Sequence, residues 1–112
     1  MAELSILNQL FSLQGNCALV TGATSGIGEA IAIGFAQAGA TVGVNGRSTE
    51  RAAATCQQIA ELGGKAIPLV ADLTTVDACR QLITDAHSAS GRVDILVNCA
   101  GMNVRQPIED VE

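Results

Sequence analysis

The stretch Thr21-Gly22-Ala23-Thr24-Ser25-Gly26-Ile27-Gly28 decides the fold of this 112-residue chain. The four residues before it, 17–20, form an apolar run that is typical of a short buried strand. After it, apolar residues recur at helical spacing over about 26–38. A strand, a glycine-rich turn and a helix in this order present backbone N–H groups and a helix N-terminus to a phosphate group.

The spacing of the glycines is Gly-x-x-x-Gly-x-Gly, which differs from the commoner Gly-x-Gly-x-x-Gly dinucleotide pattern. We expect Gly22 to permit the tight turn, Gly26 to let the backbone approach a pyrophosphate, and Gly28 to let the helix pack closely on the sheet. The alternative is a helix-capping loop whose glycines are incidental. On the first interpretation Thr24, Ser25 and Ile27 also line the phosphate site.

Composition limits the classes of protein to which the chain can belong. Hydrophobic residues make up 48% of it, with two Phe and no Trp or Tyr, so the core is built from small aliphatic side chains, as in parallel sheets covered by helices. A net charge of −5 without a basic cluster argues against a nucleic-acid partner. The N-terminal residues lack the basic region of a signal peptide, and no apolar run approaches the roughly 18 residues that span a membrane. We expect a cytoplasmic protein with no membrane partner.

No metal site is expected, because the four cysteines lie far apart and there is only one histidine. The cysteines are predicted to be small buried side chains in a reducing compartment, and His87 to be solvated at the end of a helix. The acidic residues near the end of the chain predict the first turn of a helix starting near Pro107.

Strand and helix patterns alternate along the chain. Strands are predicted at about 17–21, 41–45, 66–70 and 93–98, and helices at about 26–38, 49–62 and 75–89. Right-handed crossovers give such a chain a doubly wound parallel sheet, an α/β Rossmann-like fold, for which the usual strand order would be 3-2-1-4. Pro68 within the third strand agrees, because proline is tolerated at a sheet edge.

The end of the second strand is where such a fold selects its cofactor. An acidic residue there would bind the ribose 2′-hydroxyl of NAD, but the chain instead carries Arg47 followed by Ser48. A guanidinium suits a 2′-phosphate, and Ser48 could add a hydroxyl besides capping the next helix. The segment favours NADP, with NAD possible; the alternative is that Arg47 is merely solvated.

Two further strand ends carry candidate binding residues. Asp72 follows the third strand and could accept a hydrogen bond from an adenine amino group, or merely cap the next helix. Asn98 ends the fourth strand, where it could bridge neighbouring backbone segments, and Ala100-Gly101 leave room for a ribose. The alternative for the latter segment is an ordinary turn.

Together these residues resemble the short-chain dehydrogenase/reductase family. The glycine stretch is similar to its cofactor motif, Asp72-Leu73 to its adenine-contacting pair, and residues 98–101 to its Asn-Asn-Ala-Gly motif, with Cys99 in place of the second Asn. The resemblance covers residues 11–112. Residues 1–14 are described as a short N-terminal lead-in to the domain. It implies hydride transfer between a nicotinamide and a carbonyl or alcohol, and homo-oligomeric full-length relatives. Residues 45–47 and 102–107 faintly resemble gluconate 5-dehydrogenases.

The catalytic residues that the resemblance implies, a Ser, an Asn and a Tyr-x-x-x-Lys pair, are not found in these 112 residues, which contain no Tyr. We expect residues 1–112 to be a partial NAD(P)-binding domain, the adenosine-binding half of such an enzyme, inactive alone. The alternative is a non-catalytic nucleotide-binding module or a truncated gene remnant. A fourth strand at the sheet edge would expose Val93, Ile95 and Val97 and promote self-association.

Overall fold

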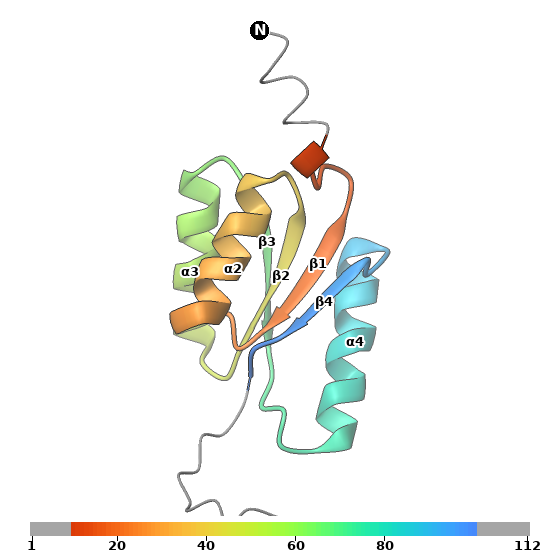
Figure 1. The fold of residues 1–112 in the computed structure, drawn as a ribbon. Helices are drawn as coiled ribbons and strands as arrows, with labels where there is room; N and C mark the ends of the chain where they lie inside the picture. The colour runs from red at the N-terminus through yellow and green to blue at the C-terminus, as the bar shows by residue number, and fades with distance from the viewer. Residues whose placement is uncertain (1–9, 101–112) are drawn as a thin grey trace, which may run out of the picture.

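The structure is a computed structural model that describes residues 10–100 (Figure 1). The strands are β1 (Cys17–Thr21), β2 (Thr41–Gly46), β3 (Lys65–Val70) and β4 (Ile95–Asn98). The helices are α2 (Gly26–Gln37), α3 (Thr49–Glu61) and α4 (Val76–Ser90). Each strand is followed by a helix or by the end of the described region, so the predicted alternation is confirmed.

The four strands form one parallel sheet in the order β3-β2-β1-β4, as predicted. Pro68 lies in β3 opposite Val44 of β2, and β3 has no strand on its other side within the described region. The prediction that this proline marks an edge is therefore confirmed. All strands run toward the same edge, the lower one in Figure 1, where the helices begin.

Helices cover both faces of the sheet, and each face packs on them through an apolar cluster. The larger joins β1 and β2 to α2 and α3 and consists of small aliphatic side chains: Ala18, Val20, Ala23, Ala32, Ala36, Ala40, Val42, Val44 and Ile59. On the opposite face Leu19 packs against Leu82 and Ala86 of α4. The aliphatic composition thus serves two-sided coverage of parallel strands, as expected.

Side-chain caps fix two of the helix starts. The Ser48 hydroxyl accepts a hydrogen bond from the Arg51 N–H at 3.2 Å, which confirms its predicted role as the cap of α3. Thr75 caps α4 in the same way through the Ala78 N–H, so that helix begins at Val76, one residue later than predicted. Gly91 ends α4 in a left-handed conformation.

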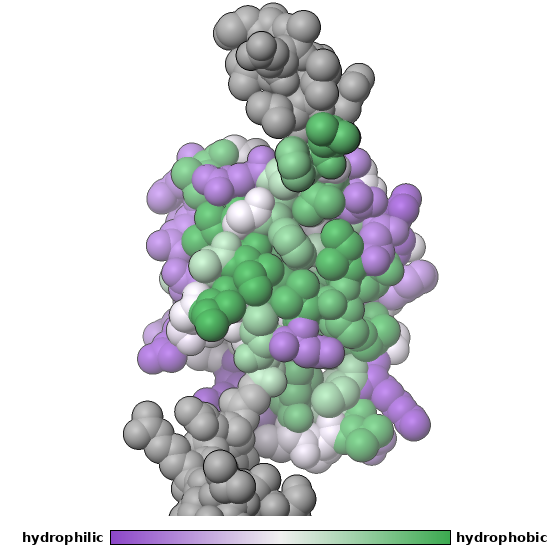
Figure 2. All heavy atoms as spheres, viewed as in Figure 1, coloured by the Kyte–Doolittle hydropathy of each residue, from purple (hydrophilic) through white to green (hydrophobic). Residues whose placement is uncertain are grey.

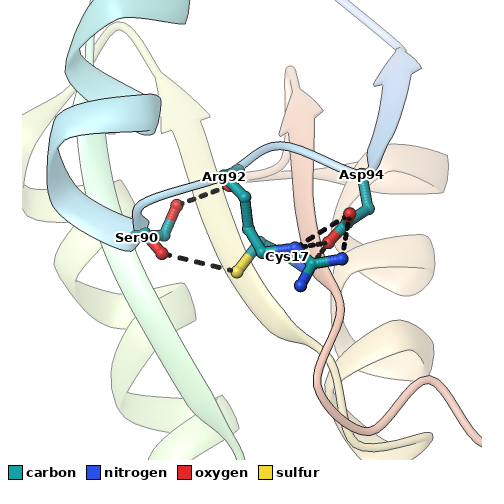
Figure 3. Close-up of polar contacts among 4 residues, drawn as sticks. All are labelled: Cys17, Ser90, Arg92 and Asp94. Atoms are coloured by element: carbon teal, nitrogen blue, oxygen red, sulfur yellow. Dashed lines mark hydrogen bonds and ion pairs between the residues drawn. The ribbon is translucent and has the colours of Figure 1, made fainter.

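The fourth strand begins at Ile95 rather than at the predicted residue 93, because an aspartate side chain replaces part of the ladder (Figure 3). Asp94 Oδ2 accepts the Cys17 N–H at 2.8 Å, a donor that a backbone carbonyl of β4 would otherwise take. Arg92 in turn holds both oxygens of Asp94. The hydrogen bonds from Arg92 and from the Cys17 N–H lower the pKa of Asp94.

Apolar side chains remain on the α2 face of the sheet, where Figure 2 shows them gathered over α2, β1 and β4. Ile95 and Val97 of β4 are half-buried there against the larger cluster, and Val93 packs on the opposite one. The prediction that β4 is an edge strand is confirmed within the described region, but Val93, Ile95 and Val97 are half-buried and not fully exposed. Leu96 is the exposed apolar residue of this strand, at 49%.

Some predictions about single residues are wrong or fall outside the described region. The expected burial of the cysteines does not hold for Cys79, which is exposed, and the other three are only half-buried. The predicted helix near Pro107 lies outside residues 10–100. Among the helices that the structure describes, none combines the length and apolarity needed to cross a membrane.

Candidate functional site

The candidate site lies at the carboxyl edge of the sheet, where the glycine turn follows β1. Gly22 and Gly26 both adopt positive φ, at 61° and 57°, a conformation that other residues rarely take. A Cβ at Gly26 would have no other atom within 4 Å, so this backbone is open to an approaching group. Ser25, Gly26 and Ile27 are all exposed, Ile27 at 76%.

The N-terminus of α2 has free hydrogen-bonding capacity beside that open backbone. Its N-cap residue, Ser25, makes no side-chain capping hydrogen bond, whereas Ser48 and Thr75 both cap their helices. The first N–H groups of a helix have no partner within it. The turn therefore offers uncapped N–H groups and the positive end of the helix dipole to the solvent.

Close backbone packing explains the other two glycines. A Cβ at Gly28 would overlap the Gly22 carbonyl oxygen, and it would lie 3.2 Å from the Cys99 Cβ. A Cβ at Gly22 would come within 2.8 Å of the Ala100 nitrogen. The turn, the start of α2 and the segment after β4 thus approach one another more closely than a side chain allows.

Thr21 joins the glycine turn to the segment after β4, a role that the sequence analysis missed. Its side chain is buried, and its Oγ1 accepts the N–H groups of Cys99 at 3.0 Å and of Ala100 at 3.2 Å. The same hydroxyl donates to the Val97 carbonyl at 3.4 Å. Thr21 thereby fixes the path of the predicted ribose-contacting segment.

Asn45 was also missed, and it joins three strand ends. Its side chain is 2% exposed. Oδ1 accepts the Gly22 N–H at 3.3 Å, while Nδ2 donates to the carbonyls of Leu69 at 3.0 Å and Ala71 at 3.4 Å. Its backbone carbonyl accepts the Ala23 N–H at 2.8 Å. One asparagine thus holds the glycine turn against the ends of β2 and β3.

The residues predicted to select the cofactor lie where β2 ends. Arg47 is exposed, and Ser48 is half-buried with its hydroxyl oxygen engaged in the helix cap. A hydroxyl that accepts a hydrogen bond still has a proton to donate, so the cap leaves Ser48 able to bind a phosphate oxygen. Gly46 lies so close to Thr24 that a Cβ at position 46 would overlap the threonine methyl group. The turn and the end of β2 are therefore in contact.

After β3, Asp72 is exposed and Leu73 is half-buried in the cluster of Leu19 and α4. The alternative that Asp72 caps α4 is wrong, because Thr75 is the cap and Asp77 is the acidic residue of the first turn. Its carboxylate faces solvent at the same edge as the glycine turn, so a contact with adenine stays a prediction.

At the end of β4, Asn98 pairs in register with Thr21 and is exposed. Within residues 10–100 it is the Thr21 hydroxyl that binds the backbone of the segment after β4, and a bridging role for Asn98 stays a prediction. Ala100 is exposed, and Gly101 lies outside the described residues. In the same region no group of three or more His, Cys, Asp or Glu side chains could hold a metal ion.

The geometry has close counterparts in known proteins. The family model for short chain dehydrogenases matches residues 16–112. The 7alpha-hydroxysteroid dehydrogenase of Escherichia coli K12 is 42% identical over 97 residues, which are 87% of this chain and 38% of that protein.

Solved structures of dehydrogenases are also similar to this chain. A 7α-hydroxysteroid dehydrogenase complexed with NADH and 7-oxo glycochenodeoxycholic acid is 41% identical, with a TM-score of 0.83 over 91% of this chain and 40% of that one. A Beutenbergia cavernae structure, described as an NAD(P)-dependent gluconate 5-dehydrogenase with NADP at low occupancy, is 45% identical. Its TM-score is 0.79, again over 91% of this chain and 40% of that one.

The chain spans 32% to 38% of the length of the curated relatives that it matches. Within that span the fold, the strand order and the glycine turn follow the resemblance seen in the sequence. The chain belongs to the short-chain dehydrogenase family.

Proposed function

We propose that this chain is the cofactor-binding part of a dehydrogenase. It binds the adenosine half of a nicotinamide dinucleotide, with a preference for NADP. The observation that carries the proposal is the uncapped N-terminus of α2 beside the open backbone of Gly26. In each of the two other described helices, the N-cap side chain accepts one N–H group of the first turn. A pyrophosphate would supply the acceptors that Ser25 does not.

The choice of NADP depends on Arg47, an exposed guanidinium at the end of β2, with the Ser48 hydroxyl next to it. No acidic side chain occupies this strand end to take the ribose 2′-hydroxyl of NAD, since Asn45 points back at Gly22. The relatives bind either form, one with NADH and one with NADP. Because relatives with the same fold bind different forms, the choice between NADP and NAD depends on the residues at the end of β2 and not on the fold.

The reaction we propose for the whole protein is hydride transfer between the cofactor and a small alcohol or carbonyl compound. The nicotinamide supplies the hydride chemistry when the cofactor is bound. These 112 residues contribute binding and orientation: the glycine turn takes the pyrophosphate, and Thr21 and Asn45 hold the strand ends around it. They contain no Tyr to exchange a proton with the substrate. Relatives that act on hydroxysteroids and gluconate supply the first substrates to test.

Calorimetric titration with NADP and NAD tests the proposal. We expect Gly26→Val to abolish binding of both, because a β-branched side chain would occupy the approach of the pyrophosphate and disfavour the positive φ. Gly34→Ala is the matched control: it lies in the same helix with open space beside it and should bind like the parent chain. Unchanged affinity in a folded Gly26→Val variant would contradict the placement of the phosphates.

A further inference from the structure

A cavity of about 350 Å³ lies beside the glycine turn, between the start of α2 and one side of α3. Thr24, Ser25 and Glu29 line it on the α2 side. Arg51, Thr55 and Gln58 line it on the α3 side. Six of its seven lining residues carry a polar or charged group, and its size falls within the range of ligand sites in proteins.

Arg51 is placed in this cavity by the cap of α3. Its N–H donates to Ser48, so it occupies the first turn of the helix, where a positive side chain is disfavoured by the helix dipole. In the part of the chain that the structure describes, the one ion pair is Arg92–Asp94, so Arg51 has no ion-pair partner among these residues. An exposed cation in an electrostatically poor position, facing polar walls, fits an anionic ligand.

Thr55 adds a second polar group to the same wall. Thr55 is 2% exposed and lines the cavity. The cavity therefore combines the Arg51 guanidinium with hydroxyl-bearing residues of both walls, Thr24 and Ser25 on one side and Thr55 on the other.

We propose that Arg51 is a second residue that selects NADP over NAD, by binding the 2′-phosphate together with Arg47. This inference rests on the proposed function, since it assigns a residue to the same cofactor. Arg47 and Arg51 lie one residue before and three residues after Ser48 and are both exposed, so a phosphate bound by the Ser48 hydroxyl would have two cations on neighbouring residues. Glu29, on the opposite wall, limits the affinity for an anion.

The test uses two probes that represent the adenosine half of the cofactor, 5′-AMP and adenosine 2′,5′-bisphosphate. They differ only in the 2′-phosphate, and binding to the 112-residue chain is followed by chemical-shift changes in NMR spectra, which also report folding. We expect Arg51→Gln to weaken the bisphosphate about tenfold and to leave 5′-AMP unchanged. Glu29→Gln should strengthen the bisphosphate alone. Arg80→Gln, an exposed arginine on α4 at the other face, is the control and should change neither.

The outcomes separate the two proposals. If the parent chain binds neither probe, the proposed function is wrong and this inference with it. If the parent prefers the bisphosphate and Arg51→Gln keeps that preference, the cofactor proposal stands and the role of Arg51 is refuted. Equal weakening of both probes by Arg51→Gln also refutes it, because the residue would then act on the whole site and not on the 2′-phosphate.

Discussion

Replacing Asn45 by Asp removes one hydrogen-bond donor group and keeps the shape of the side chain, so it measures what this asparagine contributes. An aspartate can still accept the Gly22 N–H, but it cannot donate to the carbonyls of Leu69 and Ala71. Leaving a buried polar group unpaired costs about 1–3 kcal/mol. With two carbonyls facing a buried carboxylate, we expect the free energy of unfolding to fall by about 3 kcal/mol or more at neutral pH.

The loss should depend on pH in a definite direction. Burial beside two carbonyl oxygens disfavours the charged form and raises the pKa of the new carboxyl group in the folded state. The destabilisation is therefore largest above that raised pKa, and it decreases as the pH falls and the protonated group can donate one hydrogen bond again.

Urea unfolding followed by circular dichroism is the assay, since the chain has no Trp or Tyr for fluorescence. Asn98→Asp is the matched control, with the same chemical change at an exposed strand end, and it should shift stability by no more than about 0.5 kcal/mol. Equal effects of the two substitutions, or an Asn45→Asp variant as stable as the parent at neutral pH, would refute the reasoning.

Four other outcomes are expected. Arg47→Ala should weaken NADP binding by about 1–3 kcal/mol in calorimetry and barely affect NAD; equal losses would mean that Arg47 does not contact the 2′-phosphate. Gly28→Ala should destabilise the fold by about 1–3 kcal/mol, because its methyl group would overlap the Gly22 carbonyl, whereas Gly34→Ala should be neutral or stabilising in thermal melts. The folded-state pKa of Asp94 is lowered, so its contribution to stability is present above the usual pKa of about 3.9 and is lost as the pH falls through the lowered value. Asp94→Asn should therefore remove this acid-dependent fall in the melting temperature. The 112-residue chain should show no NADP(H)-linked turnover with alcohols or carbonyls and should self-associate in light scattering through its edge strand and apolar face; turnover, or a stable monomer, would contradict this.

The fold could be predicted from local patterns because its signals are local. Alternating apolar runs and helical spacing located every described strand and helix, and the glycines at 39, 63 and 91 marked their ends. The strand order was predicted as the usual order of this fold, and Pro68 agreed with an edge position for the third strand. The start of β4 was missed because a side chain, Asp94, replaces a backbone acceptor, which no periodicity reveals.

The candidate site divides in the same way. The glycine turn and the Ser48 cap follow from short sequence spacings. Thr21 and Asn45 were missed because their partners lie 23 to 79 residues away along the chain. A signal did exist: each is a polar residue at the end of an otherwise apolar strand, where burial requires a hydrogen-bond partner. Asn98 carries the same signal but is exposed, so the pattern alone does not separate the two cases.

The order of the strands also has a kinetic consequence. Ala18 of β1 pairs with Val42 of β2, 24 residues later, but with Ile95 of β4 only after 77 residues. The difference in loop length adds about 1 kcal/mol to the entropy of closing the second pairing. During synthesis β1, β2 and β3 can therefore assemble with α2 and α3 before β4 leaves the ribosome, and one side of β1 waits unpaired until it does. Two side-chain hydrogen bonds would then set the register of β4, the last strand to pair. Asp94 binds the Cys17 N–H at one end of the β1–β4 pairing, and Thr21 binds the Ala100 N–H at the other.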